Sequence, residues 1–129
     1  MEPFNILVVD DEVTQLRALE GFLKRRKFQA HTAESGEEAL KIAEGSTIDL
    51  VLSDFKMPGW SGLVLLRKIK ELNPEIEVVI MTAYGAVEDA VEIMKAGAYD
   101  YLTKPIDLNE LENIIERVRE KQALVTENR

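Results

Sequence analysis

The sequence predicts an α/β fold in which helices cover both faces of a five-stranded parallel sheet. Three short segments are nearly continuous in apolar residues, as is typical of strands buried on both sides: 5–9, 48–53 and 77–81. Two segments of more mixed polarity, 28–33 and 98–103, are predicted to be strands nearer the sheet edges. Helical patterns alternate strictly with these strands, which favours right-handed crossovers and a doubly wound sheet.

The helices are predicted from apolar residues that recur at the helical period between the strands. The four internal patterns are Leu16, Leu19 and Leu23; Ala39, Leu40 and Ala43; Leu63, Leu66 and Ile69; and Ala90, Val91 and Met94. A last helix has one apolar face, made of Leu111, Ile114, Ile115 and Val118. Ser35 with Glu38 has the spacing of a capping box, and Asp107 with Glu110 has the same spacing. Gly97 suits the left-handed position that ends a helix.

Length and composition fit one compact domain. The chain has 129 residues, of which 46% are hydrophobic, and it has no cysteine, so disulfides and thiol chemistry are excluded. A net charge of −8 disfavours nucleic-acid binding, and we interpret the basic cluster at 24–27 as a complement to a helix dipole. The start lacks a secretory-signal pattern and no segment has membrane-spanning length, so we expect a cytoplasmic protein without membrane contact.

The last helix is predicted to run past the domain. We expect residues 1–120 to form the domain and 121–129 to begin a linker or a helical extension. Leu111, Val118 and Val125 recur every seven residues, a period that a coiled coil would continue. Docking of this helix on the core, followed by a frayed tail, is the interpretation we favour.

Five polar residues follow the ends of four predicted strands. Asp10 and Asp11 come after the first strand, Asp54 after the third, Thr82 after the fourth and Lys104 after the fifth. Ligands of open α/β sheets bind beyond the carboxyl ends of the strands. Each residue alone has an ordinary explanation as a cap, a turn residue or a solvated charge. Their occurrence together predicts one shared site.

The charges of these residues favour a divalent metal ion. Two unit charges about 4 Å apart repel by roughly 4 kcal/mol at an effective dielectric near 20, and Lys104 offsets only one of three carboxylates. Oxygen ligands suit Mg²⁺, or alternatively Mn²⁺, and Asp10 and Asp11 are placed to hold the ion. Asp54, which stands alone before the rigid turn 57–59, is the predicted nucleophile for a phosphoryl group.

These motifs resemble the response-regulator receiver domains of bacterial two-component systems. The matching residues are Val-Val-Asp-Asp-Glu at 8–12, Asp54 with Met57-Pro58 and Gly62, Met-Thr-Ala at 81–83, and Lys104-Pro105, all in family order. The resemblance covers about residues 5–120 and implies a flavodoxin-like (βα)5 fold with strand order 2-1-3-4-5. Segments 81–85 and 97–105 are most similar to receivers of the nitrogen-regulation type (NtrC family), which control sigma-54-dependent transcription activators.

The resemblance implies a role for each site residue in phosphorylation. A sensor histidine kinase would phosphorylate Asp54, with Lys104 and Thr82 assisting. Asp11, Asp54 and the Lys56 backbone carbonyl would coordinate Mg²⁺, and Asp10 would act through water.

The resemblance also implies a conformational switch. Thr82 would move toward the phosphoryl group and Tyr101 would turn inward, which changes the surface of the fourth helix, fifth strand and fifth helix. A homodimer would use this surface or the C-terminal helix. The Lys104-Pro105 bond is expected to be cis. Lys56 and Tyr84 occupy positions that tune hydrolysis in the family, and small Ala83 leaves room for phosphoryl access.

Other functions fit the sequence less well. A phosphohydrolase of the haloacid-dehalogenase kind usually needs a second acid two residues after the nucleophile, where this chain has Lys56. A carrier of flavin mononucleotide would need a Ser, Thr and Gly-rich first loop in place of the acidic residues 10–12. A receiver that acts alone by protein–protein interaction remains an alternative, and Trp60 fits either packing or a partner contact. The sequence has neither a phosphate-binding loop nor a DNA-reading helix pair, so we expect any output function to lie elsewhere. The resemblance implies a signalling switch that is not an enzyme and only transfers and loses its own phosphoryl group.

Overall fold

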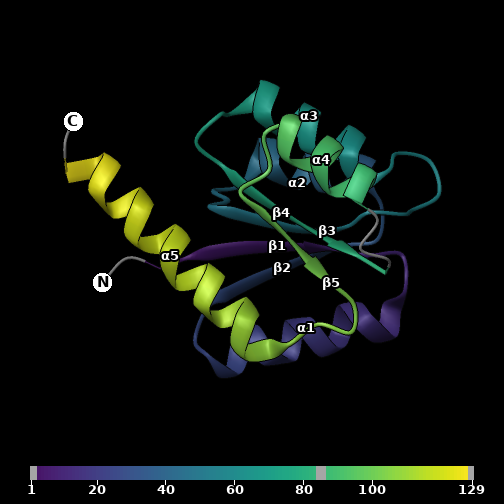
Figure 1. Cartoon of the computed structure of the whole chain (residues 1–129). Helices are drawn as coiled ribbons and strands as arrows, with labels where there is room; N and C mark the ends of the chain where they lie inside the picture. The colour runs from purple at the N-terminus through teal and green to yellow at the C-terminus, as the bar shows by residue number, and fades with distance from the viewer. Residues whose placement is uncertain (1–2, 84–86, 128–129) are drawn as a thin grey trace.

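The computed structural model describes residues 3–83 and 87–127, and strands alternate with helices throughout (Figure 1). The elements are β1 Asn5–Val9, α1 Val13–Arg25, β2 Gln29–Ala33, α2 Gly36–Gly45, β3 Leu50–Asp54, α3 Gly62–Leu72, β4 Glu77–Thr82, α4 Val87–Lys95, β5 Asp100–Thr103 and α5 Leu108–Glu127. All neighbouring strands pair in parallel, in the order β2-β1-β3-β4-β5. The predicted fold class and strand order are therefore confirmed.

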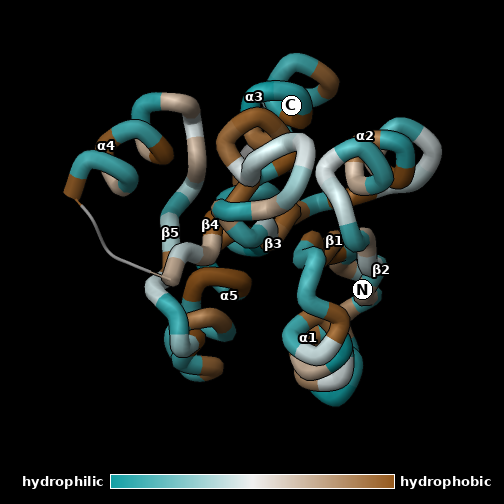
Figure 2. Tube along the Cα trace, turned by 90° about the vertical axis from the view of Figure 1, so that its right-hand side faces the viewer, coloured by the Kyte–Doolittle hydropathy of each residue, from teal (hydrophilic) through white to brown (hydrophobic). Residues whose placement is uncertain are grey.

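The sheet separates two apolar layers. Because successive side chains of a strand point to opposite faces, Ile6 and Val8 of β1 pack against α1 and α5, whereas Leu7 and Val9 pack toward α2 and α3. Figure 2 shows the resulting hydrophobic segments in the central strands and on the inner sides of the helices. No helix in the described part of the chain is both long enough and apolar enough to span a membrane. The two mixed segments form the edge strands β2 and β5, as predicted.

Helix ends agree with the capping signals, with one difference. Ser35 Oγ accepts a hydrogen bond from the Glu38 amide at 3.1 Å, but the Glu38 carboxylate accepts from the amide of Glu34 at 2.7 Å, not from that of Ser35. The predicted reciprocal bond of the capping box is therefore shifted by one residue. Asp107 Oδ1 accepts from the Glu110 amide at 3.2 Å and caps α5.

The basic residues at the end of α1 interact with the helix itself and with α5. Lys24 and Arg25 lie in the last turn of α1, where positive charge complements the helix dipole as predicted. Arg26 Cζ lies 5.0 Å from the centroid of the Phe22 ring, and Arg26 Nε donates to Glu112 Oε2 of α5 at 2.7 Å. This part of the surface therefore ties α1 to α5.

Two strands end later than the sequence predicts. Asp54 and Thr82, expected just after their strands, are instead the last residues of β3 and β4. Asp54 pairs with Met81 and Thr82 pairs with Thr103, so ladder hydrogen bonds of neighbouring strands hold both polar residues in the sheet. Both side chains are consequently on a rigid element.

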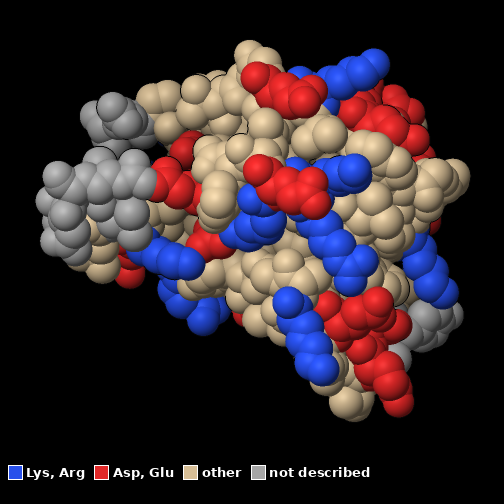
Figure 3. All heavy atoms as spheres, turned by 90° about the horizontal axis from the view of Figure 1, so that it is seen from above, with Lys and Arg blue, Asp and Glu red and all other residues tan. Residues whose placement is uncertain are grey.

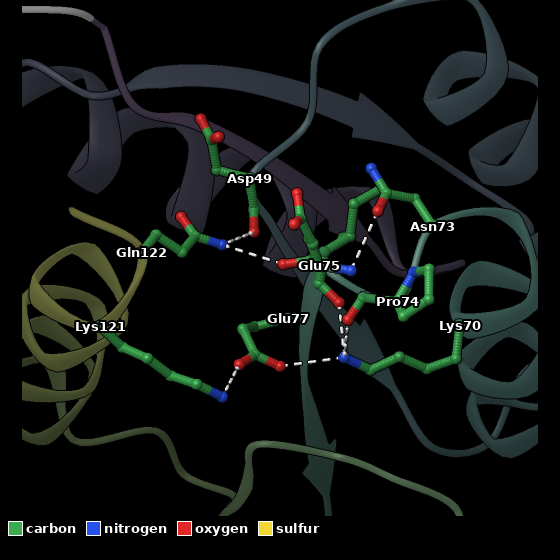
Figure 4. Close-up of polar contacts among 9 residues, drawn as sticks. Asp49, Lys70, Asn73, Pro74, Glu75, Glu77, Lys121 and Gln122 are labelled. Atoms are coloured by element: carbon green, nitrogen blue, oxygen red, sulfur yellow. Dashed lines mark hydrogen bonds and ion pairs between the residues drawn. The ribbon is translucent and has the colours of Figure 1, made fainter. Parts of the chain in front are cut away.

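The far end of α5 is attached to the amino-terminal edge of the sheet (Figure 4). Glu77, the buried first residue of β4, accepts hydrogen bonds from Lys70 Nζ at 2.9 Å and from Lys121 Nζ. Gln122 Nε2 donates to the carbonyl oxygens of Asp49 at 2.9 Å and Glu75 at 3.2 Å. Helix α5 thus remains in contact with the sheet beyond residue 120, and the division of the chain at that residue stays a prediction.

The heptad positions of α5 divide between core and tail. Leu111 and Val118 are fully buried against the sheet, which favours docking at these positions over a coiled coil. The side chain of Val125 lies outside the described residues.

Glu77 is expected to stabilise the protein in a pH-dependent way. Burial raises its pKa, but the hydrogen bonds and charges of Lys121 and Lys70 outweigh burial and hold the pKa below the ordinary value of 4.5. The stabilisation is therefore present above pH 4.5 and is lost as the pH falls through the lower folded-state pKa. Glu77→Gln should lower the free energy of unfolding by about 2 kcal/mol at pH 7, with a smaller difference from wild type at low pH.

Urea unfolding followed by Trp60 fluorescence at several pH values measures this effect. Glu116→Gln is the control, because Glu116 forms an exposed pair with Arg119 one turn away in α5. Equal losses of stability in the two variants at pH 7 would contradict the role of Glu77.

Candidate functional site

The predicted polar residues meet at the carboxyl edge of the sheet, the edge that faces the viewer in Figure 2. Asp10 directly follows β1 and is fully buried, while Asp54 and Thr82 end β3 and β4 and are also buried. Lys104 directly follows β5, and Asp11 is exposed at the rim. The parallel strand order brings together these residues from four separate segments of the chain.

Three carboxylates and one ammonium group form the centre of the site. Ligand oxygens of Asp10, Asp11 and Asp54 all lie within 4.8 Å of one another. Lys104 Nζ lies 3.0 Å from Asp54 Oδ1 and 3.7 Å from Asp10 Oδ2. The structure therefore unites four of the predicted site residues around one small space.

Backbone amides orient the two buried carboxylates. The Glu12 amide donates to Asp10 Oδ1 at 2.9 Å, and the Phe55 amide donates to Asp54 Oδ1 at 3.0 Å. Both donors lie within two residues of their acceptors, so local chain geometry sets the direction of each carboxylate. The positions of the carboxylates are thereby fixed before any ligand binds.

One oxygen of the site lacks a hydrogen bond within the described part of the protein. Asp10 Oδ2 is buried without a donor, and its 3.7 Å distance from Lys104 Nζ is an ion-pair distance, too long for a hydrogen bond. A buried anionic oxygen without a donor is costly, and a cation would remove that cost. With three carboxylates and no nitrogen or sulfur donor among them, the residues fit a hard divalent ion such as Mg²⁺.

The pKa values of Asp10 and Lys104 respond to burial and to the neighbouring charges. Burial raises the pKa of Asp10 and the charge of Asp54 raises it further, although the Glu12 amide and the Lys104 ammonium oppose them. Burial lowers the pKa of Lys104, but the hydrogen bond with Asp54 and the charges of Asp54 and Asp10 outweigh it and leave the pKa raised. Lys104 is therefore held protonated by the carboxylates around it.

Backbone contacts also place Lys104 beside Thr82. The Lys104 amide donates to the Thr82 carbonyl at 2.8 Å, which extends the pairing of β4 and β5 past the last ladder position. The Lys104-Pro105 peptide bond is cis, as expected. Thr82 and Lys104 consequently border the same end of the sheet as Asp54.

The β3–α3 loop, residues 55–61, folds back onto the end of β3. The Gly62 amide donates to the Phe55 carbonyl at 2.8 Å, and a Cβ at Gly62 would overlap the Asp54 carbonyl oxygen. Only glycine fits this close approach. Met57 is buried in the core, which leaves Lys56 held between Asp54 and an anchored side chain.

Two aromatic residues near the site are half-buried. Tyr101 of β5 packs against the apolar layer below α2, α3 and α4. Trp60 lies against Gly36 of α2, and Lys68 Nζ is 5.7 Å from its ring centroid. Of the two interpretations of Trp60, the structure therefore supports packing. Ala83 is exposed, and Tyr84 lies outside the described residues.

Sequence reasoning missed the contacts that shape this loop. Ser61 caps α3 by accepting from the Val64 amide at 3.3 Å, a role that its position before an apolar helical run could have indicated. The contact between Gly36 and Trp60 had no local signal, because the two residues are far apart in the sequence.

Comparison with known proteins identifies the family. The model of the response regulator receiver domain family matches residues 6–116. Over 113 residues the chain is 43% identical to the transcriptional regulatory protein ZraR of Escherichia coli K12. The aligned residues make up 88% of this chain and 26% of ZraR. The regulatory protein AtoC of the same strain is 38% identical over 124 residues, which are 96% of this chain and 27% of AtoC. The chain thus spans about a quarter of the length of these relatives.

Solved structures show the same likeness in three dimensions. A response regulator receiver domain protein of Clostridium thermocellum has a TM-score of 0.89 and 36% identity, with 95% of this chain and 98% of that chain covered. NtrX of Brucella abortus has a TM-score of 0.90 and 34% identity, with 98% of this chain and 29% of NtrX covered. The resemblance stated from the motifs is therefore confirmed. This chain belongs to the response regulator receiver domain family and is similar to the receivers of NtrC-family regulators.

Proposed function

We propose that this receiver is switched by phosphorylation of Asp54, with a sensor histidine kinase as the phosphoryl donor. The observation that carries the proposal is the 3.0 Å contact between Lys104 Nζ and Asp54 Oδ1 inside the acidic cluster. A buried carboxylate beside a protonated lysine is suited to phosphoryl transfer, which depends mainly on positioning and charge stabilisation.

The chemistry follows from the groups at the site. An Asp54 carboxylate oxygen attacks the phosphorus of a phosphohistidine, the P–O bond forms, and the P–N bond breaks. The histidine nitrogen keeps the bonding electrons and takes up a proton from water, while the Lys104 ammonium stabilises the phosphoryl oxygens. Thr82 donates its hydroxyl to one of these oxygens. Because the attacking group is a carboxylate oxygen, no general base is needed for the attack, and later hydrolysis by water restores the carboxylate and releases inorganic phosphate.

The proposed metal ligands are the Asp11 and Asp54 carboxylates and the Lys56 backbone carbonyl, with Asp10 acting through water. The orphaned Oδ2 atom of Asp10 and the purely oxygen donor set support Mg²⁺, with Mn²⁺ as a substitute. Receiver domains bind Mg²⁺ at an acidic pocket of this kind. A bound ion would offset the negative charge that gathers when a phosphoryl group reaches Asp54.

The proposed switch consists of Thr82 and Tyr101. Ile80 of β4 pairs with Tyr101 of β5, so a movement of Thr82, two residues along β4, would act on the strand that carries the aromatic ring. Helix α4 exposes Val87, Val91 and Met94, a set that is unusually apolar for a surface. We propose that inward rotation of Tyr101 alters this α4–β5–α5 surface and thereby homodimerisation.

A groove beside Lys104 supports docking of the kinase. It has a volume of about 460 Å³ and lies between α1 and the β5–α5 connection; its lining includes Leu19, Phe22, Lys104, Pro105 and Ile106. An apolar groove that borders the reacting site suits a helix that presents a phosphohistidine. This arrangement would bring the phosphorus to the edge of the sheet where Asp54 lies.

The proposed output is control of a sigma-54-dependent transcription activator in the cytoplasm. The likeness to ZraR, AtoC and NtrX supports this output. Direct DNA binding by the receiver is not proposed, because the net charge is −8 and basic and acidic side chains are interspersed on the face that carries α2, α3 and α4 (Figure 3). DNA contact would then belong to another module of the regulator.

Incubation with acetyl phosphate and Mg²⁺ is expected to add one labile phosphoryl group, measured by intact-mass spectrometry. Asp54→Ala should abolish the adduct, because it removes the attacking oxygen, and omission of divalent metal should prevent it. Glu116→Gln, far from the site on α5, should label like wild type. Labelling that persists in Asp54→Ala would contradict the assignment of the nucleophile.

Beryllofluoride with Mg²⁺ is expected to change Trp60 fluorescence and the dimer fraction measured by sizing chromatography. Thr82→Ala should bind beryllofluoride but shift the dimer fraction less, because the hydroxyl that responds to the phosphoryl oxygens is missing. Thr47→Ala is the control, since Thr47 is exposed in the connection between α2 and β3, outside the proposed α4–β5–α5 surface. A full dimer shift in Thr82→Ala would exclude Thr82 as the switch residue.

A further inference from the structure

We propose that the first turn of α2 braces the β3–α3 loop, with Gly36 and Trp60 as positioning residues for the Lys56 carbonyl. The inference rests on the proposed function, because it concerns a backbone oxygen assigned there to the metal. A carbonyl has no rotamers, so its direction depends only on the conformation of its loop. Mg²⁺ demands near-ideal octahedral geometry, which makes that conformation important.

The two ends of the loop are held by the sheet and the core. The Phe55 amide donates to the Met81 carbonyl at 2.8 Å, and the Gly62 amide donates to the Phe55 carbonyl at 2.8 Å. Met57 buries its side chain in the apolar layer below α2 and α3. These contacts leave the tip, residues 58–60, to be restrained by something outside the loop.

Two consecutive residues of α2 contact two consecutive residues of that tip. A Cβ added to Gly36 would lie 2.9 Å from Trp60 Cβ and 3.2 Å from Trp60 Cε3, so the Trp60 side chain rests directly on the Gly36 backbone. The next residue, Glu37, places its Oε2 atom 3.2 Å from the Cβ position of Gly59. Gly59 has a φ of +76°, a conformation that favours glycine and turns the chain at this point.

Helix α3 also contacts Trp60. Lys68 Nζ lies 5.7 Å from the Trp60 ring centroid, a cation–π distance. Helices α2 and α3 lie side by side on one face of the sheet (Figures 1 and 2). Trp60 thus contacts a residue of each of these two helices, and its half-buried state is consistent with this packing.

The first turn of α2 is itself well fixed. Ser35 caps the helix by accepting from the Glu38 amide, and the Glu38 carboxylate accepts from the Glu34 amide. Gly36 is buried and its φ lies outside the left-handed region, so the lack of a side chain there serves the close approach of Trp60. A rigid turn with no Cβ at the contact point is a firm support for the loop tip.

Gly36→Ala tests the brace, because the new methyl group must displace Trp60 and with it the loop. Mg²⁺ affinity measured by calorimetry should fall roughly tenfold, the size typical of a lost outer-shell support. The matched control is Gly45→Ala in the same helix, where an added Cβ meets nothing within 4 Å. Gly45→Ala should bind Mg²⁺ like wild type.

The measurement separates positioning from general destabilisation. Thermal unfolding of each variant establishes that it is folded at the titration temperature, and a purely structural role would change melting without changing Mg²⁺ affinity. Trp60→Ala, a change at a half-buried loop position, should weaken Mg²⁺ binding in the same direction, and it serves as the test if Gly36→Ala does not fold. The double variant Gly36→Ala/Trp60→Gly should bind Mg²⁺ with nearly the affinity of Trp60→Gly alone, because the Trp60 side-chain atoms that the new Cβ would meet have been removed.

Two results would overturn the inference, and they are distinguishable. Wild-type Mg²⁺ affinity in folded Gly36→Ala and in Trp60→Ala would exclude the brace while leaving the phosphorylation of Asp54 intact. Absence of Mg²⁺ binding in the wild-type protein would overturn the proposed metal site together with the brace.

Discussion

The confinement of three carboxylates in one small volume is the constraint on which the site depends. Asp10, Asp11 and Asp54 would separate if their positions were free, because like charges at this distance repel. The parallel sheet holds two of them at the ends of central strands, and Lys104 compensates part of their charge. The unsatisfied oxygen of Asp10 shows that this compensation is incomplete within the described part of the protein. The site is therefore suited to a cation, in agreement with the proposed metal role.

At the opposite edge of the sheet, the buried Glu77 carboxylate is fully paired with lysine side chains. Glu77 has a lysine on each side, so its charge is balanced by the protein itself, whereas the carboxylates near Asp54 are left short of positive charge. One strand, β4, carries Glu77 at its start and Thr82 at its end. The same strand thus joins the Glu77 cluster, which attaches α5 to the sheet, to the proposed metal and phosphoryl site. This contrast is one reason why we propose a functional role for the acidic cluster and a structural role for the Glu77 cluster.

A switch needs a site that can respond and a frame that does not move with it. The frame here is the central strands, whose apolar residues are fully buried on both faces, and the brace proposed for the β3–α3 loop belongs to it. The proposed responsive part includes β5 at the sheet edge, where Tyr101 is only half-buried, and the neighbouring helix α4 with its exposed apolar residues. Phosphorylation at such a site would be expressed as a changed surface, which suits signalling through partners.

The sequence by itself determined the elements, the edge and central strands, and the residues that gather at the carboxyl edge. These follow from local signals: apolar periodicity, capping residues and the position of Asp54, Thr82 and Lys104 relative to strand ends. Only the tertiary structure decided that Lys104 lies closer to Asp54 than to Asp10, that Asp10 has an oxygen without a donor, and that Trp60 rests on Gly36. It also decided that β3 and β4 continue through Asp54 and Thr82, because ladder pairing depends on the neighbouring strands. Such contacts join residues that are distant in the chain, and their distances are set by packing, which no local pattern of residues records.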